Sequence, residues 1–368
     1  MFSKNDKVSI RQVEILLILD LFSTSVLSFP RMAAEIANQD AWIISIGATL
    51  LAFLYGYIIT RVTKRFPGDT FVEISSKVLS KPVGIFLSIL FLGKLSVAMA
   101  MELRIFGELV KQVLLPRTPI EVIIASMLLI CSYLVRKGYE CKARLEEILI
   151  FIIFIPLFII LLFVLPDTDF SNLKPFLTTP LPQLLKGSYF LAFLYTPIEL
   201  ILMVGPLINN PKKAGRITFT AIGFAGVLNV VLAIITIGVL GAMGTRQQIW
   251  PVMTLMQIIE IPGAFVERQD ALMMILWILS VFSFISTLMY FISFIMTRIL
   301  KAEEHCFLVL PLVPVLYLIS LIPDNIVEVF NWIEFLVKYF RILFLLPIPL
   351  LILIVARLRK LGESIEEK

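Results

Sequence analysis

Long runs of apolar residues recur along almost the whole chain, and they limit the folds that it can adopt. The hydrocarbon core of a bilayer is about 30 Å thick, and an α-helix needs about 20 apolar residues to cross it. Measured against this length, the sequence contains ten predicted spans: 12–36, 41–60, 84–110, 119–135, 146–165, 187–208, 217–242, 270–297, 306–322 and 335–356. Of the 368 residues, 59% are hydrophobic and 16% are charged, against about 25% charged in soluble domains. The sequence therefore predicts an all-α integral membrane protein in which residues 1–368 form a single transmembrane domain.

Lysine and arginine residues mark the predicted cytoplasmic side, because short cytoplasmic loops of membrane proteins carry an excess of positive charge. With the N-terminus inside, 21 of these residues fall in inward loops and tails, seven in outward loops and four within the spans. We therefore expect a multi-pass membrane protein with both termini cytoplasmic. This asymmetry also explains the net charge of +5, so the charge does not indicate a nucleic-acid partner.

The sequence lacks the usual signatures of metal and catalytic sites. His305 is the only histidine, and Cys131, Cys141 and Cys306 show neither metal-site spacing nor a CxxC motif. Zinc sites and histidine-based catalytic sites draw their groups from such residues. We therefore expect a protein that is not an enzyme and that carries no metal and no cofactor.

Two of the predicted spans contain helix-breaking segments at matching places. One runs from Leu21 to Pro30 in the first span and the other from Phe193 to Glu199 in the sixth, and each includes the midpoint of its span. Ten spans divide into five plus five, and an odd number of crossings per half makes the second half enter from the opposite face. The pattern predicts a LeuT-like inverted repeat, about residues 8–165 and 187–356, in which broken helices 1 and 6 form a solute site at the bilayer midplane.

Proline gives a physical reason for each break. Pro30 cannot donate a hydrogen bond to the carbonyl of Val26, and the same holds for Pro197 and the carbonyl of Phe193. Neighbouring hydroxyls or a bound polar solute can satisfy these carbonyls, which lipid cannot. If the chain unwinds there, the following half-helix presents bare N–H groups and a dipole end that favours a carboxylate. An amino acid fits such a site, and a proline kink without a ligand is the alternative.

The predicted ligand-binding residues lie at the two breaks and on one polar face of the eighth span. Ser283, Ser286, Thr287 and Tyr290 recur at i, i+3, i+4 and i+7, which puts them on one side of a helix. Such a stripe either lines a site or joins helices through small polar contacts. Glu199 begins the half-helix after the second break, as a partner for a ligand ammonium, a proton acceptor or a charge that faces a watery cavity. The predicted set is Ser23, Thr24, Ser25, Val26, Leu27, Phe193, Tyr195, Thr196, Pro197, Glu199, Ser283, Ser286 and Thr287.

Two charged residues lie deep inside the predicted spans, where ionisable groups are costly and usually functional. Asp20 lies roughly 12 Å into the first span and Lys94 roughly 15 Å into the third, at 1.5 Å per residue. Both spans start at the cytoplasmic face, so we predict that Asp20 and Lys94 form a charge pair. The pair either fixes helix packing or relays a proton or a ligand. Glu102, Arg104 and Arg31 fall near the outer end, as an extracellular vestibule or as interface anchors.

Two connecting segments have an amphipathic pattern. Residues 69–81 predict a short helix on the cytoplasmic surface, and residues 250–260 predict one on the outer surface between the seventh and eighth spans. The outer segment either acts as a lid or rests in the headgroup region.

Short motifs give the chain a family resemblance. They are Ser9-Ile10-Arg11-Gln12 before the first span, Phe29-Pro30 at its break, Gln39-Asp40-Ala41-Trp42 opening the second span and Glu267-Arg268-Gln269-Asp270-Ala271 opening the eighth. With these motifs in this order, over roughly residues 8–355, the chain resembles the B subunit of bacterial spore germinant receptors. These subunits are an integral-membrane branch of the amino acid/polyamine/organocation transporter superfamily.

The resemblance implies a subunit that binds a small nutrient germinant, an amino acid, and signals to partner subunits to start germination. It implies as partners a partly soluble A subunit and a lipoprotein C subunit, and as location the spore inner membrane. By superfamily similarity, residues 23–27 and 193–197 hold the ligand. Two other functions stay open: a proton- or sodium-coupled amino acid permease, and a structural scaffold whose germinant specificity would persist after Thr196→Val and Ser25→Val.

Overall fold

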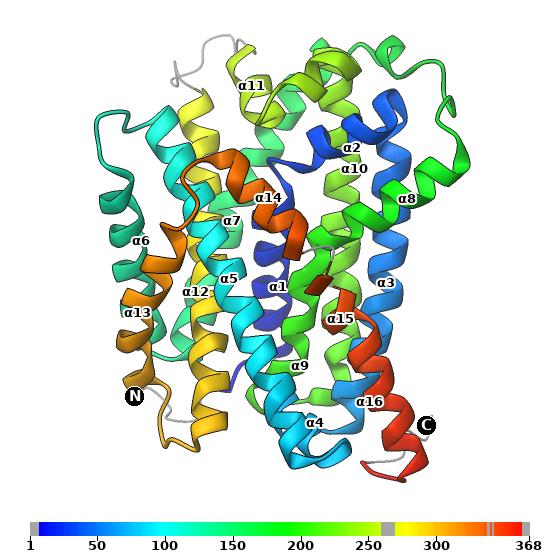
Figure 1. The fold of residues 1–368 in the computed structure, drawn as a ribbon. Coiled ribbons are helices and arrows are strands. Elements are labelled where there is room, and N and C mark those ends of the chain that lie inside the picture. Colours follow the sequence, from blue (N-terminus) through cyan, green and yellow to red (C-terminus); the bar gives the residue numbers. More distant parts are fainter. Residues whose placement is uncertain (1–6, 259–268, 337–338, 341, 363–368) are drawn as a thin grey trace.

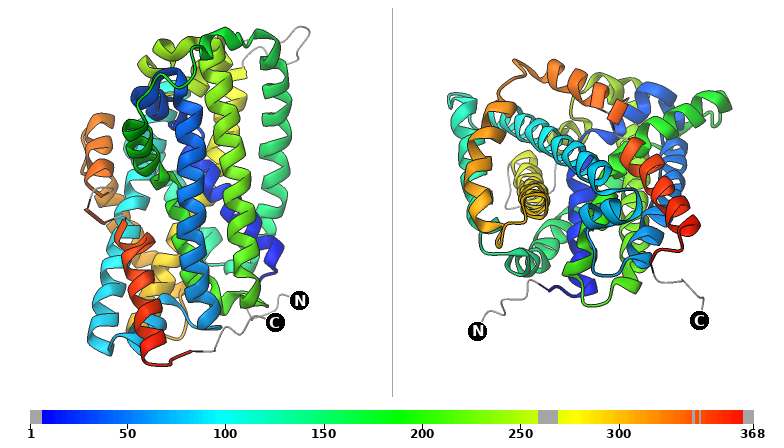
Figure 2. Two further views of the ribbon diagram at one scale, coloured as in Figure 1. Left: turned by 90° about the vertical axis from the view of Figure 1, so that its right-hand side faces the viewer. Right: turned by 60° about the horizontal axis from the view of Figure 1, so that its bottom comes forward.

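The computed structural model describes residues 7–258, 269–336, 339–340 and 342–362, and in these ranges the chain is helical (Figure 1). The helices form one bundle, and most of them run side by side along a common direction (Figures 1 and 2). Their bounds are α1 (Ile10–Ser25), α2 (Phe29–Ala37), α3 (Ala41–Arg65), α4 (Phe71–Val78), α5 (Lys81–Val113), α6 (Ile120–Val135), α7 (Tyr139–Val164), α8 (Leu181–Leu191), η4 (Ala192–Leu200), α9 (Ile201–Val204), α10 (Ala214–Gln247), α11 (Pro251–Ile258), α12 (Gln269–Leu300), α13 (Cys306–Ser320), α14 (Ile326–Leu336), α15 (Ile342–Leu345) and α16 (Pro347–Leu358).

Six helical stretches are long and apolar enough to cross a membrane: Phe29–Arg65, Lys81–Val113, Tyr139–Asp167, Leu181–Leu207, Pro211–Gln247 and Ala271–Leu300. Three shorter apolar helices accompany them: Ile120–Val135, Cys306–Ser320 and Leu343–Leu358. Large apolar side chains stand exposed around the bundle, among them Leu50 at 63%, Tyr133 at 68% and Leu162 at 66%. A soluble monomer rarely exposes so much apolar surface. The all-helical membrane class is confirmed, while the ten crossings and the inverted repeat stay predictions.

Helix α1 lies at the centre of the bundle. It packs against α7, α10, α12 and η4, and 11 of its 16 residues are buried. The motif before it fixes its start, because the Ser9 hydroxyl accepts the Gln12 N–H and the Gln12 side chain accepts the Ser9 N–H. This reciprocal capping satisfies two backbone donors that a helix start otherwise leaves free.

The first and last described helices start and finish at the same end of the bundle (lower end in Figure 1). The Val8 N–H donates to the carbonyl of Leu207 at 2.8 Å, and the Arg65 side chain donates to the carbonyl of Leu361 at 2.8 Å. An even number of crossings requires this arrangement. The excess of positive charge predicts that this end faces the cytoplasm.

The second motif ties the start of α3 to the segment before α8. The Asp40 carboxylate accepts the backbone N–H groups of Leu177 at 2.7 Å and Thr179 at 2.9 Å. The Gln39 side chain donates to the Thr178 hydroxyl at 2.9 Å. These contacts give Gln39 and Asp40 a structural role. Of the fourth motif, residues 267 and 268 lie outside the described residues, and residues 269–271 begin α12.

The helix predicted within residues 69–81 is confirmed as α4, and Thr70 with Glu73 forms a capping box at its start. Gly84 lets α4 approach the start of α5, because a Cβ atom at position 84 would lie 2.4 Å from the backbone nitrogen of Ser76. The outer segment predicted within residues 250–260 corresponds to α11 as far as Ile258, and residues 259–260 lie outside the described residues.

We expect Gly84→Ala to lower the free energy of unfolding by about 1 to 3 kcal/mol, the usual cost of overpacking. The clash is with backbone, which cannot rotate away. Gly93→Ala on the same helix is the matched control, because a Cβ there meets nothing within 4 Å and alanine is the better helix former. Unfolding of both variants in detergent tests this, and equal effects at the two positions would show that α4 does not press on Gly84.

Candidate functional site

The first predicted break is an interruption between α1 and α2. Helix α1 ends at Ser25, residues 26–28 form a turn, and α2 begins at Phe29 with Pro30 in its first turn. Proline is favoured there because its fixed φ suits a helix start and its missing N–H would have no partner in the helix. Helix α2 leaves the break at an angle to α1 (Figure 1).

The second predicted break is a change of helix type. Residues Ala192–Leu200 form the nine-residue 3₁₀ helix η4, although 3₁₀ runs longer than three or four residues are uncommon. The Thr196 hydroxyl donates to the carbonyl of Phe193, the group that Pro197 leaves without its α-helical donor. The chain therefore tightens into the 3₁₀ form at this break, and the condition that it unwinds there is not met. Bonding of the 3₁₀ type and the Thr196 hydroxyl satisfy the backbone locally.

The two breaks touch each other. The Thr24 hydroxyl at the end of α1 donates to the carbonyl of Leu194 in η4 at 3.0 Å. Tyr195 anchors η4 on its other side, where its hydroxyl lies 2.8 Å from the Thr49 hydroxyl on α3 and accepts the Asn229 amide of α10 at 3.4 Å. The sequence placed both breaks at one depth, and the structure brings them into contact.

A cavity of about 670 Å³ borders both breaks. The predicted site residues that line it are Ser23, Thr24, Leu27, Lys94, Phe193, Thr196, Pro197 and Glu199. Its other walls are largely apolar and include the aromatic residues Phe190, Trp250, Trp277, Phe284 and Phe330. An apolar pocket of a few hundred cubic ångströms with a few convergent polar groups is the usual form of a small-molecule site.

Several predicted ligand residues do not line this cavity. Ser25 and Val26 are buried in the core, and the Ser25 hydroxyl donates to the carbonyl of Leu21. Tyr195 points toward α3 and α10, as described above. A substitution at Ser25 therefore does not test contact with a ligand in the cavity, whereas a substitution at Thr196 does.

The polar face of α12 also lies away from the cavity, which α12 instead lines with Trp277, Phe284 and Leu288. Ser283 donates to Glu146 at 2.7 Å, and Thr287 donates to Asp20 at 2.9 Å. The Ser286 hydroxyl is buried and has no hydrogen-bond partner among the described residues. The stripe therefore joins α12 to α7 and α1.

Four polar groups of the cavity lie on α1, α5 and η4, and Arg31, Glu35, Asn331 and Glu334 also line it. Lys94 and Glu199 form a buried ion pair across it, between α5 and η4. The Ser23 hydroxyl lies beside the Glu102 carboxylate, but it makes no hydrogen bond of regular geometry to a described residue. Glu102 lines the cavity two turns beyond Lys94 on the same face of α5, and it forms no ion pair with a described residue. The cavity therefore offers a ligand a carboxyl group that has no ion-pair partner among the described residues, with the Ser23 hydroxyl beside it.

The predicted ion pair between Asp20 and Lys94 is wrong. Among the described residues, the ion-pair partner of Lys94 is Glu199, and Asp20 accepts a hydrogen bond from Thr287. Depth along a helix axis does not fix the direction in which a side chain points. Lys94 faces the cavity, whereas Asp20 faces α12.

A second buried charge cluster was not predicted from the sequence. Lys142 and Glu146 form a fully buried i,i+4 ion pair on α7. The Ser283 hydroxyl donates a hydrogen bond to Glu146 as well. The sequence assigned Lys142 to a cytoplasmic loop, because the fifth span was expected to begin at residue 146 and α7 begins at Tyr139. The i,i+4 spacing of opposite charges was the available signal.

Comparison of the sequence with known proteins identifies the family of the chain. The sequence model of a family described as spore germination protein matches residues 7–329. Spore germination protein YndE of Bacillus subtilis is 29% identical over 366 residues, covering 99% of this chain and 100% of the relative. Spore germination protein A2 of the same organism is 27% identical, covering 92% and 93%, and spore germination protein KB is 26% identical, covering 96% and 95%. Because the match extends over most of its length, the chain belongs to the spore germination protein family and is a B-type germinant receptor protein.

Proposed function

We propose that this chain is the ligand-binding membrane subunit of a germinant receptor, and that its cavity holds an amino acid. One observation carries the proposal: the two interrupted segments meet through Thr24 and Leu194, and both border the same cavity. Interrupted helices that meet in the interior of a membrane protein leave polar backbone where only a solute, water or a protein side chain can satisfy it.

The charges of the cavity favour a zwitterion. The Glu102 carboxyl group matches an ammonium group, because an opposite charge beside it compensates for the hydration that a buried carboxylate loses. The start of α2, with Arg31 lining the cavity beside it, matches a carboxylate through its free N–H groups and dipole. The apolar walls, with their aromatic residues, match an apolar or aromatic side chain.

As a sensor, the protein converts binding into a change of conformation, which requires that the ligand prefer one of two states. The long 3₁₀ helix η4 is the element suited to change, since such stretches often mark hinges. We propose that the change is passed to an A subunit and a lipoprotein C subunit in the spore inner membrane.

Binding and flux of labelled amino acids test this function. The purified chain is expected to bind one or a few of the twenty common L-amino acids, supplied as a labelled mixture, and to show no uphill uptake in proteoliposomes. Absence of binding to the whole mixture, with the protein folded by its unfolding transition, would overturn the proposal.

The permease alternative has its own supporting observation. Asp20 on α1 lies near Lys142 and Glu146 on α7, and all three side chains are buried. Intramembrane ionisable groups of this kind serve in proton pathways. Sustained accumulation of a labelled amino acid by proteoliposomes under an imposed proton or sodium gradient would establish transport and exclude a pure sensor.

A further inference from the structure

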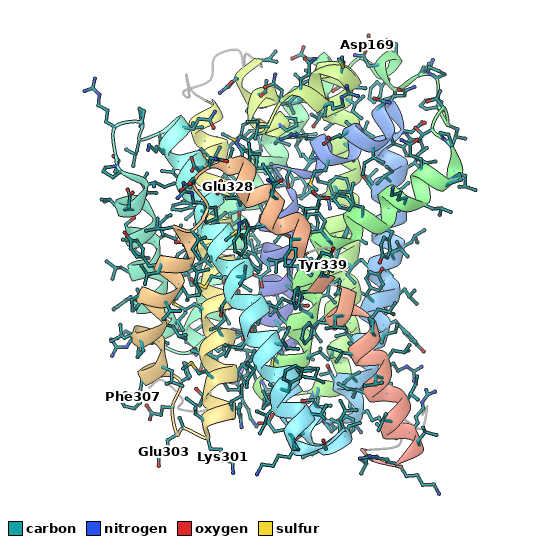
Figure 3. All side chains as sticks on the ribbon, viewed as in Figure 1. Asp169, Lys301, Glu303, Phe307, Glu328 and Tyr339 are labelled. Atoms are coloured by element: carbon teal, nitrogen blue, oxygen red, sulfur yellow. The ribbon has the colours of Figure 1, made fainter. Side chains whose placement is uncertain are left out.

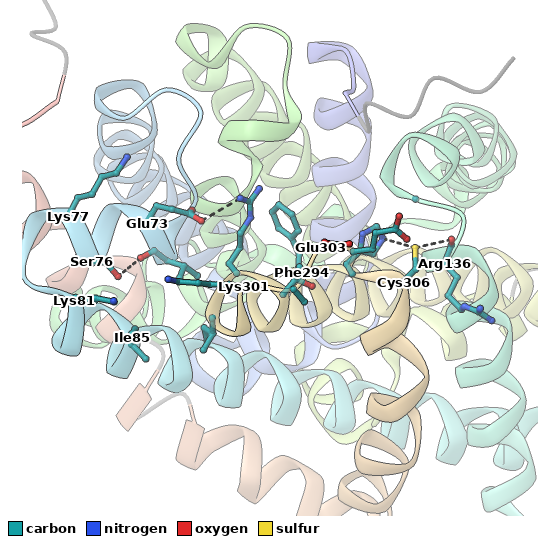
Figure 4. A pocket seen from close by; sticks show the side chains of 18 of the residues that line it. Glu73, Ser76, Lys77, Lys81, Ile85, Arg136, Phe294, Lys301, Glu303 and Cys306 are labelled. Atoms are coloured by element: carbon teal, nitrogen blue, oxygen red, sulfur yellow. Dashed lines mark hydrogen bonds and ion pairs between the residues drawn. The ribbon is translucent and has the colours of Figure 1, made fainter.

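A groove at the end of the bundle predicted to face the cytoplasm has no part in the ligand cavity. Its volume is about 1060 Å³, and it lies between the start of α5, the turn from α6 to α7 and the end of α12 (Figure 4). Lys301 and Glu303, which line it, lie at the opposite end of the bundle from Asp169 (Figure 3). No described residue lines both the groove and the ligand cavity.

Basic side chains dominate the groove, and only some of them are neutralised. Lys77 is held by Asp69 at 2.7 Å, and Arg298 lies 3.6 Å from Glu73. Four further cations line the groove without an ion-pair partner among the described residues. They are Lys81, Arg136, Lys137 and Lys301. The groove therefore has cationic groups available for an anion.

The backbone around the groove adds to this preference. Helix α5 begins at Lys81, α7 follows Gly138 and α13 follows His305, and all three positions line the groove. The free N–H groups and the dipole of a helix start favour negative charge. Glu303 and Glu304 also line the groove, so four unpaired cations and three helix starts face two carboxylates.

The surfaces next to the groove indicate what kind of anion it takes. Beyond Lys81, α5 exposes Phe86 at 60% and Ile89 at 52%. Helix α13, which packs against α5, exposes Phe307 at 76% and Leu310 at 50%. A polar groove that continues into two apolar faces matches a molecule with an anionic head and apolar tails. An acidic segment of a soluble protein would leave those faces uncovered.

We propose that this groove binds the phosphodiester headgroup of an anionic phospholipid. The phosphate lies between Lys81 and Lys301, and the acyl chains follow the exposed faces of α5 and α13. Basic pockets between helices on the cytoplasmic side of a membrane bind anionic headgroups in this way. The lipid joins α5, α7 and α12 at one end of the bundle.

Lipid titration of the purified chain in an uncharged detergent, followed by native mass spectrometry, tests the proposal. Phosphatidylglycerol is expected to bind more tightly than phosphatidylcholine with the same acyl chains. Lys81→Gln with Lys301→Gln is expected to weaken phosphatidylglycerol binding about thirtyfold, since each basic residue near an anionic lipid contributes about fivefold. Lys81→Arg with Lys301→Arg is expected to keep the affinity.

Lys212→Gln with Lys213→Gln is the matched control, because it removes the same charge from exposed positions outside the groove. Equal loss of affinity in this control, or equal binding of the two lipids, would overturn the proposal. Two competitors separate the sources of the anion. Displacement of phosphatidylglycerol by equimolar glycerol phosphate would assign the groove to a soluble phosphate, and displacement by a polyglutamate peptide would assign it to an acidic partner. Either result would refute the lipid site.

Discussion

Replacing Lys142 with methionine is expected to lower the free energy of unfolding by about 3 to 5 kcal/mol, the usual effect of removing one partner from a buried ion pair. Lys142 and Glu146 are both essentially inaccessible to solvent. Asp20 lies close enough to Lys142 for its negative charge to be stabilised by the lysine as well. Without the lysine, two carboxylates remain in the core, and among the described residues the Ser283 and Thr287 hydroxyls are their side-chain donors. Equilibrium unfolding in mixed SDS and detergent micelles measures the loss.

Arg144→Met is the matched control for this prediction. Arg144 and Glu140 form an ion pair at the same i,i+4 spacing on the same helix, but the Arg144 side chain is 60% exposed. Exposed pairs contribute about 0 to 1 kcal/mol. The double variant Lys142→Met with Glu146→Leu is expected to recover most of the stability, because a buried pair replaced by apolar groups is often neutral. Similar losses for Lys142→Met and Arg144→Met would contradict the buried cluster.

Replacing Glu102 with glutamine is expected to weaken binding of the amino acid about ten- to a hundredfold. A hydrogen bond to a charged group contributes about 1.5 to 3 kcal/mol, and each 1.4 kcal/mol is a factor of ten. Glutamine keeps the size of the side chain and removes the charge that matches an ammonium group. Binding of the labelled amino acid by scintillation proximity gives the dissociation constants of both forms.

Glu108→Gln provides the control on the same helix, since Glu108 pairs with Arg104 and does not line the cavity. It is expected to bind the ligand as tightly as the unmodified chain. If Glu102→Gln also binds with unchanged affinity while the fold is intact, Glu102 does not hold the ammonium group.

Features that depend on local chemistry could be predicted from the sequence. Pro30 and Pro197 mark the breaks because proline lacks a backbone donor wherever it occurs, and Ser9 with Gln12 gives a capping box within four residues. Neighbouring hydroxyls were one of the two expected sources of hydrogen bonds at the breaks, and the Thr196 hydroxyl is such a donor. The apolar runs predicted helices, although α7 begins earlier than its predicted span and η4 has the 3₁₀ form. Contacts through Thr24 and Tyr195 hold η4 against α1 and α3.

Features that depend on rotation about helix axes could not be predicted. Asp20, Lys94 and Glu199 all lie in the interior of the bundle. Their depth along the helix axes therefore does not decide whether Lys94 pairs with Asp20 or with Glu199. Ser283 and Thr287 were correctly grouped on one face, but the neighbour of that face is set by packing of α12 against α1 and α7. Lys142 was assigned to a loop because a charged residue at the edge of an apolar run usually marks the end of a membrane span. The sequence alone does not show that its partner, Glu146, is buried.

Thiol accessibility at the two breaks is the most direct test of a solute cavity shared by them. In a background without Cys131, Cys141 and Cys306, Leu27→Cys and Thr196→Cys are treated in proteoliposomes with a charged methanethiosulfonate reagent. We predict that both positions react, that the same amino acid protects both, and that Val227→Cys, 66% exposed on the side of α10, stays unreactive in the lipid. Reaction at neither break, or no amino acid that protects both positions, would contradict the account.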